Sequence, residues 1–331
     1  MKSSDELARL ARETGERLVA DLARAESLSA GWTDCDVGYA LLSRAMDRCL
    51  ARLAATECWG KRNQLPSGEL WTAAGAWLDV SWLQHQARFK PRGYAGDFEM
   101  FDRFWRRACC DHPLGRLFDR YFQCQAAVEA VRGRTQQLAA SLVERCLASD
   151  PQRFFHVASI GCGPAIELAL AAQALAGGSG APLKYTLLDL DEAALAHAQQ
   201  RLSPWLAAEQ IVVARENLYR LADRPRAAVL LDCVDFVCCS GLFDYLPDDA
   251  AQKLLRFFWE RLRPGGMLTV GNFAPHNPTR AYMEWIGNWY LLYRTSGDLA
   301  RLAKAGGIPE TSFTIGAERL GIDLFLEAVK A

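Results

Sequence analysis

Hydrophobic positions at helical spacing dominate the first 150 residues of the chain. The first apolar stripe has members three or four positions apart: Leu7, Leu10, Thr14, Leu18 and Leu22. A second stripe follows the same spacing: Val37, Leu41, Ala45, Cys49 and Leu53. Ser3 followed by Glu6 has the pattern of a capping box and predicts the start of the first helix. The pattern therefore predicts an all-helical N-terminal part.

Turn signals divide this helical part. Residues 60–67 are expected to form a turn, and a third helix is expected to pass through Trp71 and Leu78. Residues 89–97 contain one proline and two glycines, so a loop is expected there. One long helical stretch is predicted from 114 to 148.

After residue 150, short apolar or β-branched runs alternate with helical patterns. The expected strands cover 156–160, 185–189, 211–214, 234–239 and 267–273. The helices between them are expected at 165–176, 193–206 and 248–262. Because strand–helix–strand units place successive strands parallel, the pattern predicts a doubly wound α/β sheet. Two last strands, 311–315 and 322–328, predict an antiparallel hairpin that closes the sheet.

Length and composition fit this two-part organisation. The chain has 331 residues, of which 50% are hydrophobic and 23% charged, so it can bury a full core and is not a disordered chain. We expect a helical cap or lid over 1–120 and a core over 121–331, in which 121–150 is a lead-in helix. The sequence leaves the oligomeric state open.

The charge and the cysteine content narrow the binding partners, metal sites and compartment that we expect for this chain. The net charge is −1 and neither half is strongly basic, so neither nucleic acid nor an anionic membrane is an expected partner. No apolar run approaches about 18 residues, so no membrane insertion is expected. The eleven cysteines form no C-x-x-C pair and the five histidines are scattered, so no metal site is expected. This usage indicates a reduced, cytoplasmic protein.

A glycine-containing turn follows the first predicted strand. Gly161-Cys162-Gly163 stands where a strand passes into a helix, and glycines there let peptide N–H groups approach a ligand at the helix N-terminus. A dinucleotide fingerprint would need glycine at position 166, where Ile166 stands. The turn indicates a nucleotide site and makes NAD a less expected ligand.

Polar side chains also follow the next two strands. Asp189 ends the second strand, 26 residues after Gly163, where a carboxylate can accept hydrogen bonds from ribose hydroxyls. Asp191 is better placed as the N-cap of the following helix. Asn217 after the third strand can pair with an adenine edge, although an exposed loop asparagine would look the same.

In this order, the elements over about 150–331 resemble the class I S-adenosylmethionine (SAM)-dependent methyltransferases. Gly161-Cys162-Gly163 matches the glycine loop of that family, Asp189 its ribose-binding acid and Asn217-Leu218 its adenine-contacting position. Residues 235–245 match its fourth motif, and Pro264-Gly265-Gly266 matches its turn before strand five. The resemblance implies a Rossmann-like fold, with SAM as cofactor. The cofactor-binding residues it implies are Gly161, Cys162, Gly163, Glu167, Asp189, Leu190, Asn217, Leu218 and Ser240. Ser159 stands where the family usually has an acid that helps hold the methionine ammonium, so Glu167 or a residue of the preceding helix is expected to take that role.

A narrower resemblance reaches into the helical part. Residues 90–100, 277–285 and 289–294 look like a bacterial group associated with biosynthesis of 3-hydroxypalmitic acid methyl ester. This resemblance implies a SAM enzyme with a helical N-terminal cap, and it does not fix the substrate. Enzymes of similar build include cyclases that close the side chain of SAM itself into azetidine-2-carboxylate.

Four residues are candidates for a catalytic role: Tyr94, Tyr245, His276 and Arg280. His276 could act as a general base, or could simply pack between Pro275 and Pro278. Arg280 could clamp a substrate carboxylate, or cap a surface turn. The rings of Tyr94 and Tyr245 could steady the sulfonium, although buried tyrosines with one hydrogen bond are commoner.

Aromatic residues after the fifth strand form a further pattern. Trp285, Trp289 and Tyr293 recur every four residues, which predicts a helical stripe that packs in the core or lines an acyl or aromatic pocket. The favoured function is methyl transfer from SAM to a small molecule, with a carboxylate or hydroxyl of a fatty-acid-like or amino-acid-like secondary metabolite as acceptor. One alternative is the cyclase reaction, which would release 5′-methylthioadenosine. The other is a SAM-binding regulator without turnover.

Overall fold

The computed structural model describes residues 3–29, 31–33, 35–178 and 180–331, which fold into two compact units. The first, called here the helical unit, consists of Met1–Glu129 together with Asn277–Leu291. The second, called here the sheet unit, consists of Ala130–His276 together with Leu292–Ala331. The first division between the compact units lies after Glu129, and a segment far along the chain belongs to the helical unit.

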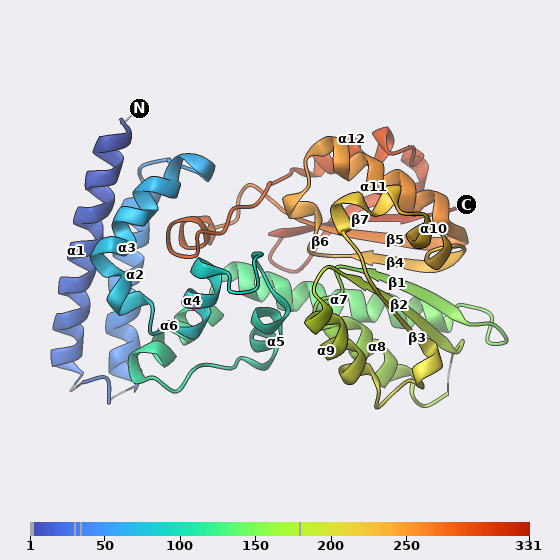
Figure 1. The fold of residues 1–331 in the computed structure, drawn as a ribbon, viewed down its shortest axis with the longest axis horizontal. Helices are drawn as coiled ribbons and strands as arrows, with labels where there is room; N and C mark the ends of the chain where they lie inside the picture. The colour runs from blue at the N-terminus through green and yellow to red at the C-terminus, as the bar shows by residue number, and fades with distance from the viewer. Residues whose placement is uncertain (1–2, 30, 34, 179) are drawn as a thin grey trace. The chain divides into compact units, whose positions relative to one another are not determined.

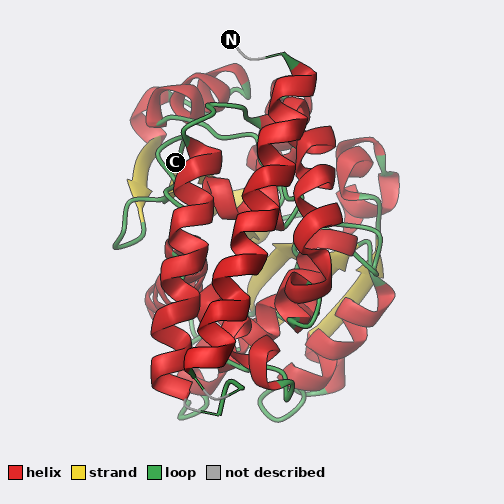
Figure 2. Ribbon diagram, turned by 90° about the vertical axis from the view of Figure 1, so that its left-hand side faces the viewer, coloured by secondary structure: helices red, strands yellow, loops and turns green. Residues whose placement is uncertain are grey.

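The helical unit is built from successive helices joined by short turns (Figures 1 and 2). They are α1 Ser4–Leu28, α2 Cys35–Ala54, α3 Gln64–Leu78, α4 Trp82–Phe89, α5 Phe98–Arg106, α6 Pro113–Gln123 and the start of α7, Ala126–Leu147. The first helix packs against both α2 and α3. No helix in the described part of the chain is long and apolar enough to cross a membrane.

The predicted start of α1 is confirmed, whereas the predicted apolar stripe of α2 and the predicted turn over 60–67 are each wrong in part. Ser3 Oγ accepts a hydrogen bond from the backbone N of Glu6 at 3.2 Å, and Glu6 Oε2 accepts one from the backbone N of Ser3 at 2.7 Å. Val37, expected on the buried stripe of α2, is 45% exposed. The expected turn over 60–67 is a 3₁₀ turn only over Gly60–Asn63. From Gln64 onward the chain is already helical, because Pro66 in a first helical turn breaks no hydrogen bond.

The long helix expected over 114–148 is in fact two helices. It breaks at Cys124 and Gln125, between α6 and α7. Thr279 Oγ1 accepts a hydrogen bond from the backbone N of Ala127 at 3.0 Å and so satisfies an N–H group in the first turn of α7. The break therefore depends on a cap that lies 152 residues away in the sequence.

A buried carboxylate anchors the 277–291 segment in the helical unit. Glu284, 1% exposed, accepts hydrogen bonds at Oε2 from Gly60 N (2.6 Å) and Asn63 Nδ2 (2.8 Å). Its Oε1 accepts from Arg280 Nε at 2.7 Å. Since removing one partner leaves the remaining polar groups without compensation, this carboxylate holds the segment in place.

The aromatic stripe predicted after the fifth strand is not a continuous helix. The chain makes one π-helical turn over Tyr282–Ile286, and Asn288 then has φ +48°, which ends the helical path. Trp285 and Trp289 are nevertheless buried, as the core-packing interpretation expects. Their spacing of four is therefore produced by an irregular segment.

The sheet unit contains one seven-stranded sheet in the order β3-β2-β1-β4-β5-β7-β6 (Figure 1). Its strands are β1 Phe155–Ile160, β2 Leu183–Asp189, β3 Ile211–Arg215, β4 Val234–Cys239, β5 Leu262–Phe273, β6 Phe313–Ala317 and β7 Asp323–Val329. Strands β1 to β5 pair parallel, whereas β7 pairs antiparallel with β5 and β6. This confirms the predicted doubly wound sheet with a C-terminal antiparallel hairpin.

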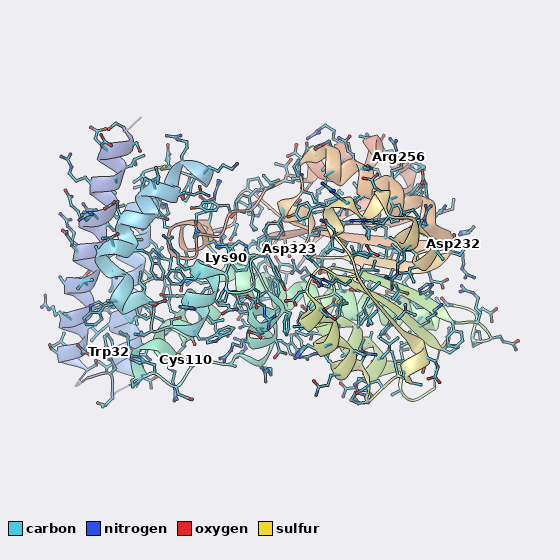
Figure 3. All side chains as sticks on the ribbon, viewed as in Figure 1. Trp32, Lys90, Cys110, Asp232, Arg256 and Asp323 are labelled. Carbon is cyan, nitrogen blue, oxygen red and sulfur yellow. The ribbon has the colours of Figure 1, made fainter. Side chains whose placement is uncertain are left out.

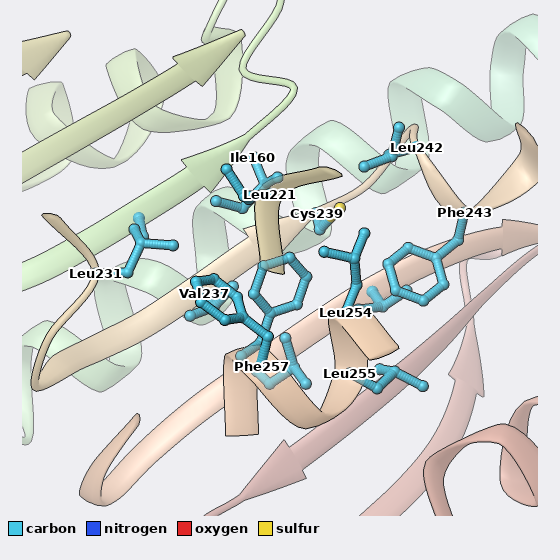
Figure 4. Packing of buried hydrophobic residues seen from close by; sticks show 14 of the residues in the cluster. Ile160, Leu221, Leu231, Val237, Cys239, Leu242, Phe243, Leu254, Leu255 and Phe257 are labelled. Carbon is cyan, nitrogen blue, oxygen red and sulfur yellow. The ribbon is translucent and has the colours of Figure 1, made fainter. Parts of the chain in front are cut away.

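Helices cover both faces of the sheet and enclose two apolar cores. The helices of this unit are the rest of α7, then α8 Ile166–Leu175, α9 Glu192–Leu202, α10 Pro225–Leu230, α11 Asp248–Arg261 and α12 Ser296–Ala305. Residues of α7, α8 and α9 share one core with the sheet. Residues of α11 and α12 share the other, which Figure 4 shows around Val237 and Phe257. Because side chains alternate along a strand, Val157 and Ala158 of β1 serve opposite cores.

Two features of the sheet unit differ from the sequence expectations. Helices α10 and α12 were not predicted. The turn expected before the fifth strand lies within β5, because Gly265 N and Gly266 O bond to Lys330 and extend the pairing with the last strand. The extended backbone is thus stabilised by pairing that local sequence does not show.

Glu284→Ala is expected to lower the free energy of unfolding by about 3 kcal/mol, because it removes one member of a buried ion pair. Denaturant unfolding monitored by tryptophan fluorescence would measure this. Glu69→Ala is the matched control, since Glu69 pairs with Arg12 on the surface of the same unit and should cost less than about 1 kcal/mol. Equal losses in the two variants would contradict the anchoring role.

Candidate cofactor site at the carboxyl edge of the sheet

The loop after β1 turns sharply and is held against β2. Gly161 and Gly163 have φ of +68° and +48°, a backbone region that favours glycine. The backbone N groups of Gly161 and Cys162 both donate to the carbonyl of Leu188, at 2.8 and 3.2 Å. A Cβ atom at Gly163 would meet no heavy atom within 4 Å, so the space beside that glycine is open to a ligand.

Asp189, at the end of β2, joins this loop to the next helix. Its Oδ2 accepts from Gly163 N and its Oδ1 from Asp191 N, each at 3.0 Å. Burial raises the pKa of Asp189, while the hydrogen bonds from the two backbone N–H groups act in the opposite direction. Asp191 in turn caps α9, since its Oδ1 accepts from Ala193 N at 2.9 Å, as the sequence indicated.

Exposed apolar side chains flank the ends of β2 and β3. Leu190 is 47% exposed, and Tyr219, which the sequence reasoning missed, is 54% exposed. Between them in the sequence, Asn217 Oδ1 accepts from Tyr219 N at 3.1 Å and caps a short 3₁₀ helix, Leu218–Asp223. Leu218 is buried beneath the glycine loop, since a Cβ at Gly161 would lie 3.4 Å from it. A flat apolar base could lie against the exposed pair.

A buried arginine of α7 lies against the residue that follows β4, and sequence reasoning also missed it. Strands β1 and β4 pair at Ser159 and Cys238, and Ser240 is the first residue after β4. Arg134 of α7 donates from Nη1 to the carbonyl of Ser240 and to Asp323 Oδ2, both at 2.8 Å. Asp323 begins β7 (Figure 3). Helical periodicity could not reveal Arg134, because nothing local distinguishes it from the other arginines of α7.

Acidic side chains surround this arginine. Burial would lower the pKa of Arg134, but the charges of Asp323, Asp244 and Glu167 outweigh it and the pKa is raised. The carboxyl of Glu167, in the first turn of α8, has its own pKa raised by burial and lowered in part by Arg134. Arg134 is therefore a buried cation close to three carboxyl groups.

Asp244 follows β4 and is tied to β5. It lies in the turn Phe243–Tyr245, where its Oδ1 accepts from Asn272 Nδ2 (3.0 Å) and from Phe273 N (2.7 Å). Burial, followed by the charge of Asp323, raises its pKa to about 7. Arg294 supports the same group by donating from Nη1 to Asn272 Oδ1 at 2.7 Å.

The four candidate catalytic residues are divided between the units. In the sheet unit, half-buried Tyr245 follows the same strand as Ser240, whereas exposed His276 bonds through Nε2 to the carbonyl of Gly321 at 2.8 Å. Tyr94 and Arg280 belong to the helical unit. There the guanidinium of Arg280 pairs with Glu284 and lies 4.9 Å from the ring centre of Trp59. Their catalytic roles stay predictions.

Comparisons with known proteins found a family model and several similar structures. Residues 158–268 match the family model of a methyltransferase domain. A possible exported protein from Bordetella parapertussis has a similar structure, with 21% identity, a TM-score of 0.60 and coverage of 77% of this chain and 85% of its own. Magnesium protoporphyrin IX methyltransferase from Synechocystis PCC 6803 is 19% identical, with a TM-score of 0.45 over 65% of this chain and 94% of its own. No curated protein matches the chain.

Residues 158–268 of the sheet unit thus match a methyltransferase domain, and the strand ends of this unit have groups that fit SAM. The open space beside Gly163 admits a close ligand, and Asp189 has a carboxylate at the position suited to ribose. Leu190 and Tyr219 supply exposed apolar surface for a base. When bound, SAM supplies a methyl group that is already activated by its sulfonium.

Asp244→Asn should flatten the pH dependence of stability. A carboxyl whose folded pKa is about 7 keeps its proton while the unfolded chain, with a pKa near 4, loses it, so its contribution to stability falls as pH rises from about 4 to 7. The amide cannot titrate but can still accept from Phe273 N. Denaturant midpoints of both proteins across this range measure the effect. Parallel curves for wild type and variant would contradict the raised pKa.

Proposed function

We propose that the chain methylates a small molecule, and that the acceptor is a carboxylate or hydroxyl of a fatty-acid-like or amino-acid-like secondary metabolite. The observation that carries the acceptor assignment is that two separate segments meet in the helical unit. Lys90 Nζ donates to the carbonyl of Asn288 at 2.8 Å. A Cβ at Gly96 would lie 2.8 Å from Trp289, so a glycine is needed for this close approach. The two segments lie within 90–100 and 277–294, whose sequences resemble the 3-hydroxypalmitic acid methyl ester group.

Positioning is the main task that we assign to the protein. The glycine loop and Asp189 would hold the nucleoside, Leu190 and Tyr219 would contact the base, and the aligned acceptor would then meet the methyl group. A carboxylate acceptor is ionised at neutral pH and needs no base. For such an acceptor, alignment and exclusion of water would suffice.

A hydroxyl acceptor would require a base, and His276 is our proposal for it. Its Nε2 must donate to reach the carbonyl of Gly321, so in the neutral ring Nδ1 is the nitrogen able to accept a proton. Tyr94, Tyr245 and Arg280 remain proposed contacts to the sulfonium or the acceptor. The pairing of Arg280 with Glu284 gives that side chain a structural role as well.

We also infer a reducing compartment, the cytoplasm. The ten cysteines whose side chains the structure describes are all free thiols, and six of them are buried. Disulfide-forming compartments would tend to oxidise so many thiols.

A single assay assigns the reaction even while the acceptor is unidentified. The purified protein is incubated with SAM alone and then with a panel of 3-hydroxy fatty acids and small amino acids, and the products are resolved by mass spectrometry. Intact SAM in the first incubation and S-adenosylhomocysteine in one of the others are expected. Methylthioadenosine with an equal amount of a cyclic amino acid would instead establish the cyclase reaction. SAM binding without any product would favour a regulator.

Asp189→Ala is expected to weaken SAM binding by about 1.5–3 kcal/mol, because it removes a charged hydrogen-bond acceptor and releases the N–H of Gly163. Isothermal titration calorimetry measures the change. Asp191→Ala is the matched control: it removes a helix cap worth about 1 kcal/mol of stability and should leave SAM affinity unchanged. Unchanged affinity in Asp189→Ala would overturn the site assignment.

A further inference from the structure

A guanidinium without a counter-ion lies in the helical unit, near the end of α4. Arg88 is half-buried, its Nη1 donates to Ser67 Oγ at 2.9 Å, and its Cζ lies 5.1 Å from the ring centre of Trp71. Its Nε and Nη2 donate to none of the described residues, and no carboxylate in that part of the chain pairs with it. A serine and an aromatic ring therefore hold the guanidinium in place, while one edge of its fork of donors stays open.

A second cation lies close to it, at the C-cap of α4. Lys90 Nζ donates to backbone carbonyls, those of Ala87 at 2.9 Å and of Asn288 at 2.8 Å, and it forms no ion pair with a described residue. Burial and then the charge of Arg88 lower the pKa of Lys90 to about 8, and burial lowers the pKa of Arg88 as well. Because two neighbouring positive charges are costly when they are partly buried without a counter-ion, this place favours an anionic ligand.

Arg280, predicted as a carboxylate clamp, is less suited to that task than Arg88. Its Nε already donates to Glu284 Oε1 at 2.7 Å, and Glu284 is buried. The charge of Arg280 is therefore compensated within the protein, whereas the charge of Arg88 is not.

Exposed aromatic surface adjoins the guanidinium of Arg88. The ring of Trp71 also contacts Phe89, with the two ring centres 5.6 Å apart, and Phe89 is 54% exposed. A ligand bound here would therefore meet a cation and an apolar ring together. That combination suits a carboxylate joined to a hydrocarbon chain better than it suits a small inorganic anion.

We propose that Arg88 binds the carboxylate of a fatty-acid-like molecule whose hydrocarbon chain lies on Phe89 and Trp71. Lys90 adds positive charge close to the same carboxylate. This inference rests on the proposed function, since it takes the ligand to be the acceptor, and it adds the group that would recognise the acceptor. The open edge of the guanidinium could donate to both carboxylate oxygens at once. Because Ser67 and Trp71 already hold the guanidinium, little side-chain freedom would be lost on binding.

The test measures the binding of two probes by isothermal titration calorimetry: 3-hydroxydecanoate and its methyl ester, which has the same chain and no charge. In the wild type, the ester should bind at least about tenfold more weakly, because it cannot accept two charge-assisted hydrogen bonds. In Arg88→Gln, the carboxylate should bind as weakly as the ester does. Phe89→Ala should weaken both probes by the same factor, about threefold or more, because it acts on the chain.

Matched variants keep the outcome interpretable. Arg12→Gln alters an arginine of the same unit that pairs with Glu69 on the surface, and it should change neither affinity. Arg88→Lys keeps the charge but loses the fork, so it should restore part of the affinity for the carboxylate. An unchanged near-ultraviolet circular dichroism spectrum shows that a variant is folded. If Arg88→Gln does not fold, Arg88→Lys takes its place, with an expected loss of about threefold or more relative to the wild type.

The possible failures are distinguishable. If the wild type binds both probes equally or binds neither, or if Arg88→Gln binds 3-hydroxydecanoate as the wild type does, the role of Arg88 is overturned. Displacement of 3-hydroxydecanoate by inorganic phosphate at a lower concentration than by acetate would also overturn it, because the site would then be one for phosphate. None of these results decides the proposed function, which fails if SAM yields no S-adenosylhomocysteine with any acceptor of the panel.

Discussion

The carboxylate of Asp189 is the interaction on which the cofactor site depends. One oxygen accepts from Gly163 and the other from Asp191, so a single side chain fixes the glycine loop of β1 and the start of α9. Burial makes this charge costly, and the two backbone N–H groups compensate for part of that cost. A residue suited to ribose recognition thus also builds the loop that the ribose would approach.

The helical unit depends in the same way on the carboxylate of Glu284. It gathers Gly60, Asn63 and Arg280, the first of which lies 224 residues before Glu284 in the sequence. The segment that leaves the sheet unit after His276 is thereby fixed among helices encoded by the first 129 residues. The proposed class of acceptor depends on this arrangement, because Trp289 of this segment packs closely against Gly96. In each unit, therefore, a buried carboxylate accepts hydrogen bonds from backbone or amide donors and so joins separate segments of the chain.

Much of the fold could be predicted from local pattern. The strands β1 to β5, the hairpin and the capping box of α1 follow from periodicity and turn chemistry, which are properties of neighbouring residues. What could not be predicted depends on distant partners. The break before α7 needs Thr279, the pairing of Gly265 and Gly266 needs Lys330, and the place of 277–291 needs Glu284.

The residues of the candidate site also differ in whether the sequence alone could predict them. Asp189 and the glycine loop could be predicted, because their spacing along successive strands is visible in the sequence. Arg134 and Tyr219 could not, because an arginine on a helix and a tyrosine in a loop acquire meaning only from what lies beside them. A structure of the protein with S-adenosylhomocysteine bound tests the central claim most directly. The account predicts ribose hydroxyls on Asp189 and the nucleoside beside the glycine loop; a nucleoside bound away from the carboxyl ends of β1 and β2 would contradict it.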